Sequence, residues 1–192
     1  MNIYQGLIVN LLYMLFKLVI GIYYMLPWLI SMGIYYLVLS IVKIYLIVCY
    51  KRLCNQMQCY RNIGYGLFLL NIPMGGMIIL MIKTNAGYSY PGYIIYLSAL
   101  YTFYTVIVAV INLVKFHKTG NLILSANKII NFVCALMSIL ALQTAMISRF
   151  SSHGDSYRQM MNTITGVIVY VLVIMTAFYM IIHSKKGKKV YE

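Results

Sequence analysis

Six apolar stretches, each long enough to cross a lipid bilayer, occupy most of this chain and leave only short polar connections between them. A helix needs about 20 residues, each rising about 1.5 Å, to cross a hydrocarbon core of roughly 30 Å. Within lipid a helix satisfies its own backbone hydrogen bonds, so each stretch is predicted to be helical. We therefore expect an all-α fold, a polytopic bundle of about six transmembrane spans in one domain, residues 1–192. The spans are expected near residues 4–25, 28–50, 62–83, 92–115, 126–148 and 162–183.

The composition agrees with a membrane protein and argues against a soluble one. Of the 192 residues 63% are hydrophobic and only 9% are charged, and the mean hydropathy is +0.86. The net charge of +13 would suggest nucleic-acid binding in a soluble protein, but no polar domain is present to carry that function. The basic residues cluster instead at the ends of apolar stretches, where anionic headgroups lie. We expect membrane lipids, anionic ones above all, as partners, and no nucleic acid.

The basic residues also predict an orientation. The side facing the cytoplasm is usually richer in Lys and Arg. Three basic residues fall on one side of the predicted spans, namely Lys83, Arg149 and Arg158. Ten fall on the other side: Lys51, Arg52, Arg61, Lys115, Lys118, Lys128, Lys185, Lys186, Lys188 and Lys189. Both termini are therefore predicted to be cytoplasmic, with residues 184–192 as a basic tail; if the first stretch lay in the interface, only five spans would remain.

Lys17 lies near the middle of the first apolar stretch, where a cation costs about 2.5–3.5 kcal/mol to insert. Only Asp155 and Glu192 are acidic, and neither lies within a predicted span. Lys17 is therefore expected to be deprotonated, to bond to carbonyls and to Tyr or Asn oxygens, or to bind an anion such as a lipid phosphate. At about 100° per residue it shares one narrow stripe with other polar or small residues. That stripe is Gly6, Asn10, Tyr13, Lys17, Gly21 and Tyr24.

Two further stretches carry candidate ligand-binding residues. The fourth places Tyr93, Tyr96, Tyr101 and Tyr104 within one arc, which suits either a hydroxyl-lined cavity or interhelical packing. The third contains Asn71 and Pro73, and a proline that removes a backbone donor predicts a broken helix of the kind that holds ions in transporters. We select Lys17, Asn71, Tyr101 and Tyr104 as ligand-binding candidates that converge on one polar pocket. Lys43, near the end of the second stretch, is expected to extend to the cytoplasmic interface.

The fifth stretch has a small, polar face that favours close approach of another helix. Its members recur at helical spacing and are Asn127, Asn131, Cys134, Ser138, Ala141 and Ala145. Asn131 and Ser138 are the predicted helix-packing residues of this face.

Residues for catalysis or metal binding are sparse. Ser151, Ser152, His153 and Asp155 are close neighbours in one loop, and a catalytic triad needs groups held by a rigid scaffold. Cys49, Cys54 and Cys59 have four residues between neighbours, at the wide limit of zinc-site spacing, and no fourth ligand lies near them in the sequence. We predict no catalytic residue, no metal site and no cofactor, and expect the protein not to be an enzyme.

Several short sequence features follow one another in a recognisable order. In chain order they are Lys17, Gly21 and Tyr24 before Trp28, then Tyr35–Tyr36, FLLN at 68–71, YTFY at 101–104 with Asn112 and Lys115, LALQTAM at 140–146 and Met161–Asn162. This order resembles a group of uncharacterised bacterial multi-pass membrane proteins. The resemblance covers most of the chain and implies the bacterial inner (plasma) membrane, but it implies no substrate.

These observations favour a non-catalytic membrane component that binds lipid or another membrane protein, including a second copy of itself. The alternative is a small transporter or channel for an anion or a polar solute, using Lys17, Asn71 and the break at Pro73. A lipid-modifying enzyme is the least favoured reading, because the spans contain no acids or clustered histidines to move protons.

Overall fold

The protein is an all-α bundle of six helices, as the sequence predicts. The computed structural model describes residues 3–52, 55–84, 92–114, 122–150 and 155–188. Every helix is long and apolar enough to cross a membrane, which makes the chain a multi-pass membrane protein. The helices are α1 (Ile3–Tyr23), α2 (Pro27–Lys51), α3 (Gln56–Thr84), α4 (Gly92–Val114), α5 (Leu122–Phe150) and α6 (Asp155–Lys188).

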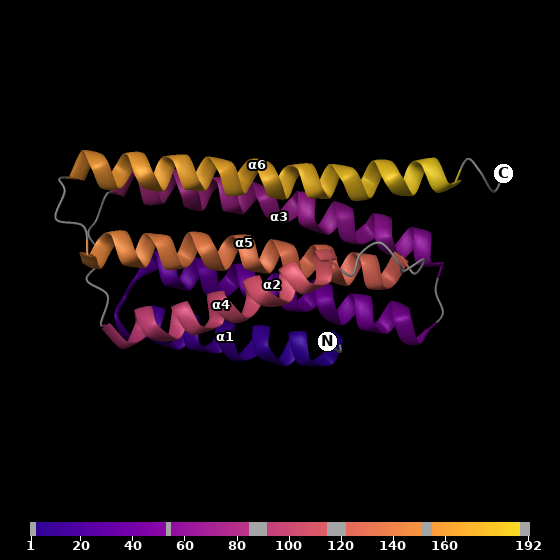
Figure 1. Ribbon diagram of the computed structural model, residues 1–192, viewed down its shortest axis with the longest axis horizontal. Coiled ribbons are helices and arrows are strands. Elements are labelled where there is room, and N and C mark those ends of the chain that lie inside the picture. The colour runs from indigo at the N-terminus through magenta and orange to yellow at the C-terminus, as the bar shows by residue number, and fades with distance from the viewer. Residues whose placement is uncertain (1–2, 53–54, 85–91, 115–121, 151–154, 189–192) are drawn as a thin grey trace.

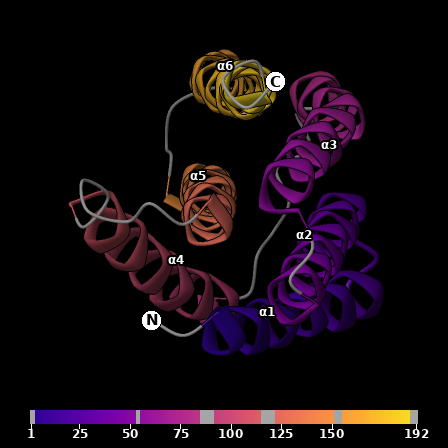
Figure 2. The same cartoon turned by 90° about the vertical axis from the view of Figure 1, so that its right-hand side faces the viewer.

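The helices lie side by side along the long axis of the molecule (Figure 1). Three pairs pack most extensively: α1 with α2, α4 with α5, and α3 with α6, the last of which are far apart in the sequence. Helix α5 lies in the middle and contacts α2, α3, α4 and α6, as the end-on view shows (Figure 2). The arrangement leaves α1 and α4 on the face of the bundle away from α6 (Figure 2).

The helix boundaries differ from the predicted spans mainly at the polar ends. Helix α3 begins at Gln56 rather than near 62, because Asn55 accepts a hydrogen bond of 3.1 Å from the backbone N–H of Met57, which is typical of an N-cap. Helix α6 continues to Lys188, so the first part of the predicted basic tail is helical. Residues 189–192 lie outside the described residues.

Pro73 does not break α3, contrary to the prediction. The helix is continuous from Gln56 to Thr84 with Pro73 inside it. Packing against α6 supports the helix just beyond the proline, where a Cβ added to Gly75 would lie 3.2 Å from the Cε2 atom of Tyr170. Membrane helices tolerate proline where neighbouring helices support the backbone, and α3 follows that rule.

The turn between α1 and α2 is a tight hairpin. The backbone N–H of Leu26 donates to the carbonyl of Gly21 at 2.8 Å, and the N–H of Met25 donates to Ile22 at 3.2 Å. Met25 has a positive φ of 50°, and the two bonds match the Schellman motif that ends many helices. Pro27 then begins α2, where its missing donor is harmless.

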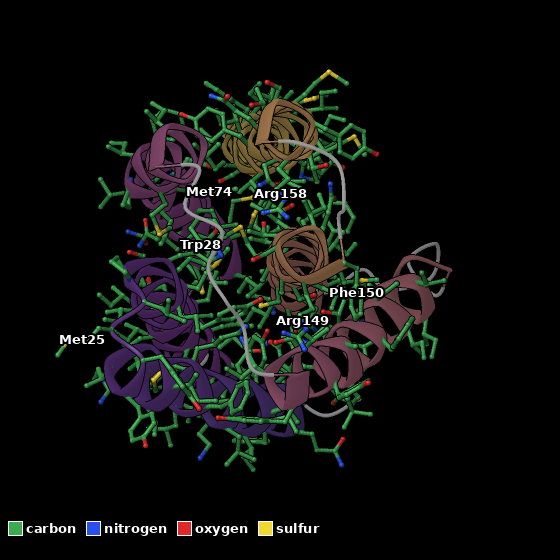
Figure 3. The ribbon with its side chains drawn as sticks, turned by 90° about the vertical axis from the view of Figure 1, so that its left-hand side faces the viewer. Met25, Trp28, Met74, Arg149, Phe150 and Arg158 are labelled. Carbon is green, nitrogen blue, oxygen red and sulfur yellow. The ribbon has the colours of Figure 1, made fainter. Side chains whose placement is uncertain are left out.

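Trp28 lies inside the bundle rather than at the lipid interface. Its side chain is only 2% exposed. Figure 3 shows Trp28 directed into the bundle, whereas Met25 projects away from it. The hairpin turn rotates the first residues of α2 inward, so this tryptophan contributes to the core instead of an aromatic belt.

Gly21 lets α1 approach α2 closely, and this approach is testable. A Cβ at Gly21 would lie 2.8 Å from the backbone nitrogen of Ile30, an atom that cannot move aside without shifting α2. We expect Gly21→Ala to lower the free energy of unfolding by about 1–2 kcal/mol, despite the better helix propensity of alanine. Thermal unfolding in mild detergent measures the change.

Gly76→Ala is the matched control, because a Cβ at Gly76 would have no heavy atom within 4 Å. This variant is expected to be neutral or to gain up to about 1 kcal/mol from helix propensity. Equal stability of Gly21→Ala and Gly76→Ala would contradict the close packing of α1 on α2.

Candidate functional site

Two lysines are buried between α1, α2, α4 and α5. Lys17 and Lys43 are each about 1% exposed. The buried polar side chains of the described residues include amides and hydroxyls but no carboxylate. Both lysines must therefore find neutral acceptors, aromatic rings or bound anions inside the bundle.

Lys17 meets α4. Its Nζ donates to the Oγ of Ser98 at 3.0 Å. The same nitrogen lies 5.0 Å from the centroid of the Tyr13 ring, a cation–π distance. The predicted inward direction of Lys17 agrees with its burial, but its hydrogen-bond acceptor is a serine hydroxyl rather than a Tyr or Asn oxygen.

An aromatic and polar cluster fills the bundle between the two lysines. The rings of Tyr13 and Tyr101 stack with centroids 3.6 Å apart, and the ring of Tyr36 meets them edge-on at 5.0 and 5.7 Å. The Tyr101 hydroxyl donates to Asn10 Oδ1 at 2.9 Å, and Asn10 Nδ2 donates to the sulfur of Cys134 at 3.2 Å. These contacts join α1, α2, α4 and α5 across the interior.

Lys43 is buried as well, although it is predicted to extend to the interface. Its Nζ donates to the backbone carbonyl of Gly6 at 3.2 Å, so it faces α1. The residue lies on a face of α2 with Tyr36 and Ser40, at positions i, i+4 and i+7. This polar stripe can be seen in the sequence, and it indicates that Lys43 points into the bundle.

A groove of about 440 Å³ lies between α1 and α4. Two side-chain bridges join these helices beside it, Lys17 to Ser98 and Tyr101 to Asn10, and beyond the end of α1 the Tyr24 hydroxyl lies 2.7 Å from that of Tyr93. The groove is apolar apart from phenol groups, and Tyr101 and Tyr104 both belong to its lining. The complete lining is Val9, Leu12, Tyr13, Phe16, Leu97, Leu100, Tyr101 and Tyr104.

The inward face of α4 differs from the predicted tyrosine arc. Tyr93 and Tyr96 are exposed, and the buried hydroxyl residues are Ser98, Tyr101, Thr102 and Thr105. The small hydroxyl residues allow α4 to approach α5, whereas the phenols of Tyr93 and Tyr96 are exposed and only that of Tyr101 is buried among these tyrosines.

The predicted packing residues of α5 are both buried. Ser138 lies against α4, where Thr102 Oγ1 donates to its carbonyl at 3.1 Å and Thr105 Oγ1 lies 2.9 Å from its hydroxyl. Asn131 lies nearer the start of α5 than Ser138, and it lines a small cavity together with Lys43.

Asn71 is not part of the Lys17 site. It lies on α3, which packs against α6, α2 and α5, and its Nδ2 donates to the carbonyl of Leu67 at 3.2 Å. Of the four predicted ligand-binding residues, Tyr101 and Tyr104 line the same groove, and Lys17 lies beside them because Tyr13 contacts both Lys17 and Tyr101. Asn71 lies in a different helix interface.

The described residues contain no group of three or more His, Cys, Asp and Glu side chains that would hold a metal. Cys49, Cys59 and Cys134 are buried. Cys54 and the loop residues 151–154 lie outside the described residues, so the predicted absence of a catalytic site stays a prediction.

No protein-family model, no curated protein and no solved structure matches the chain. The resemblance to bacterial multi-pass membrane proteins therefore stays a prediction.

The pairing of Lys17 with Ser98 is open to a direct test. Ser98→Ala removes the hydroxyl that accepts from the buried Nζ of Lys17, so we expect a loss of about 1–3 kcal/mol in the free energy of unfolding. In a Lys17→Met background the same substitution should have little effect. A double-mutant cycle of thermal unfolding measures the coupling.

Ser40→Ala serves as the control, because Ser40 is equally buried but donates to the carbonyl of Tyr36. Its effect should be the same with or without Lys17. An equal loss for Ser98→Ala in both backgrounds would show that the serine does not serve the lysine.

Proposed function

We propose that this protein is a non-catalytic integral membrane protein that binds lipid and holds an acyl chain in the groove between α1 and α4. The groove itself is the observation that carries this proposal. The groove has room for an acyl chain, it opens toward the outside of the bundle, and apolar side chains line it.

The groove has a firm floor and open sides. Tyr13 and Tyr101 form the floor, and their stacked rings are tied to Asn10 by the Tyr101 hydroxyl. Leu12 and Leu100 form part of the sides and are largely exposed. In a bilayer a groove favours one occupant over bulk lipid through close van der Waals packing, and fixed rings provide such a surface.

A second groove supports a preference for anionic lipid. It lies between α5 and α6, measures about 340 Å³ and has Lys128 and Asn112 in its lining. The other lining residues are mainly apolar: Ile129, Phe132, Leu172, Met175, Thr176 and Tyr179. A lysine beside an apolar groove suits a lipid with an acyl chain and an anionic headgroup.

The proposed setting is the bacterial inner (plasma) membrane with both termini in the cytoplasm. The excess of Lys and Arg on one side of the spans supports this orientation. Six consecutive spans place the start of α1 and the end of α6 at the same end of the bundle, and Figure 3 shows Arg149 and Arg158 together at one end. In place of a lipid, the α1–α4 face would also accept a membrane-protein partner or a second copy of the chain.

Transport of an anion is the second candidate, and the two buried lysines favour it. The rings of Tyr13, Tyr36 and Tyr101 fill the interior between those lysines. The groove is open whereas this interior is filled, so the geometry favours lipid binding.

Filling the groove tests the proposal. Leu12→Trp places a bulky ring in the groove and should displace the acyl chain while leaving the buried contacts of α1 intact. Native mass spectrometry of protein extracted in mild detergent should show one lipid on the wild type and a lower bound fraction, by about tenfold, on the variant.

Leu15→Trp is the control, because Leu15 is comparably exposed on α1 but does not line the groove. It should retain the lipid. Equal lipid occupancy in both variants would contradict the groove as the site, and a retained protein in place of lipid would favour the partner reading.

A further inference from the structure

A small cavity beside Lys43 lies apart from the open groove. It measures about 10 Å³, which is about the space of one water-sized particle. Residues of α1, α2, α4 and α5 line it: Gly6, Asn10, Lys43, Tyr104, Thr105, Val108, Asn131 and Cys134. Tyr104 lines both the cavity and the groove.

The cavity contains hydrogen-bond donors that lack acceptors. Asn131 is 5% exposed, and its Nδ2 has no partner among the described residues. The Lys43 ammonium has three donors, of which the described structure satisfies one, through the carbonyl of Gly6. Two donors from different helices, α2 and α5, therefore face one small space.

Two other polar side chains of the lining, Asn10 and Thr105, are already engaged. Asn10 accepts from Tyr101 and donates to Cys134. Thr105 Oγ1 bonds within α4 and lies 2.9 Å from Ser138 Oγ. Neither supplies the missing acceptor for Lys43 and Asn131.

Charge decides what kind of acceptor fits best. No buried carboxylate is present in the described part of the chain, so the charge of Lys43 has no counter-charge from the protein. An isolated ammonium in a low-dielectric interior is strongly unfavourable. A water molecule would accept hydrogen bonds but leave that charge uncompensated, whereas a monovalent anion does both.

We propose that the cavity between Lys43 and Asn131 binds one small monovalent anion, a halide of the size of chloride. Lys43 supplies the charge and a hydrogen bond, and the Asn131 amide supplies a second hydrogen bond. The anion links α2 to α5 and stabilises the bundle. The site is independent of the lipid groove and does not rest on lipid binding.

The test compares thermal unfolding of the purified protein in chloride, bromide and gluconate salts of equal ionic strength. Chloride and bromide should raise the melting temperature of the wild type by about 5 °C relative to gluconate, which is too large for the cavity. An equal melting temperature in all three salts overturns the proposal and leaves a water molecule and a neutral lysine.

Asn131→Asp is the diagnostic variant, because it places a carboxylate where the anion would lie. It should melt at the same temperature in chloride and gluconate. Asn127→Asp is the matched control, since Asn127 is also buried on α5 but does not line the cavity. It should keep the full chloride shift.

The remaining outcomes are also decisive. A chloride shift that persists in Asn131→Asp would place the ion on exposed lysines and overturn the proposal. If Asn131→Asp does not fold, Asn131→Ala takes its place: it removes the amide donor and should lose most of the chloride shift, and a full shift in it overturns the proposal. Leu12→Trp should retain the chloride shift, so failure of the anion site and failure of the lipid groove are separate results.

Discussion

The constraint on which the rest of this structure depends is the burial of two lysines inside a bundle of apolar helices. In a bilayer, polar groups must find their partners within the protein. Lys17 finds Ser98 and the ring of Tyr13, and Lys43 finds the carbonyl of Gly6. Each contact crosses from one helix to another or fixes a ring at a helix interface. The lysine-bearing faces of α1 and α2 therefore point inward, toward α4 and α1 respectively.

This constraint divides the bundle into two parts of different character. The α1, α2, α4 and α5 helices enclose the polar cluster, and long side chains bridge α1 to α4 beside the groove. The α3 and α6 pair instead packs through small residues: a Cβ at Gly166 would lie 2.8 Å from Ile78, and one at Gly64 would lie 3.1 Å from Ile181. Helix α5 contacts both parts and holds them together.

Much of the fold follows from hydropathy and helical periodicity, and the site follows only in part. Apolar length predicts the six helices, and the stripe through Lys17 and the small face of α5 both lie inward as expected. Periodicity does not say which helices are neighbours, so it placed Asn71 with Lys17 although α3 packs elsewhere. It also did not predict that Tyr93 and Tyr96 point outward, because phenols suit a lipid interface and a core equally well. Pro73 lies in a continuous helix that packs along α6, and periodicity does not give that packing.

The burial of the two lysines is the central claim, and reductive methylation of the protein in its native membranes tests it directly. Formaldehyde and a borane reagent modify accessible lysines, and peptide mass spectrometry then measures the modified fraction at each position. Lys17 and Lys43 should stay largely unmodified while Lys51, exposed at the end of α2, reacts. Reaction of Lys17 and Lys43 as fast as Lys51 would contradict the account.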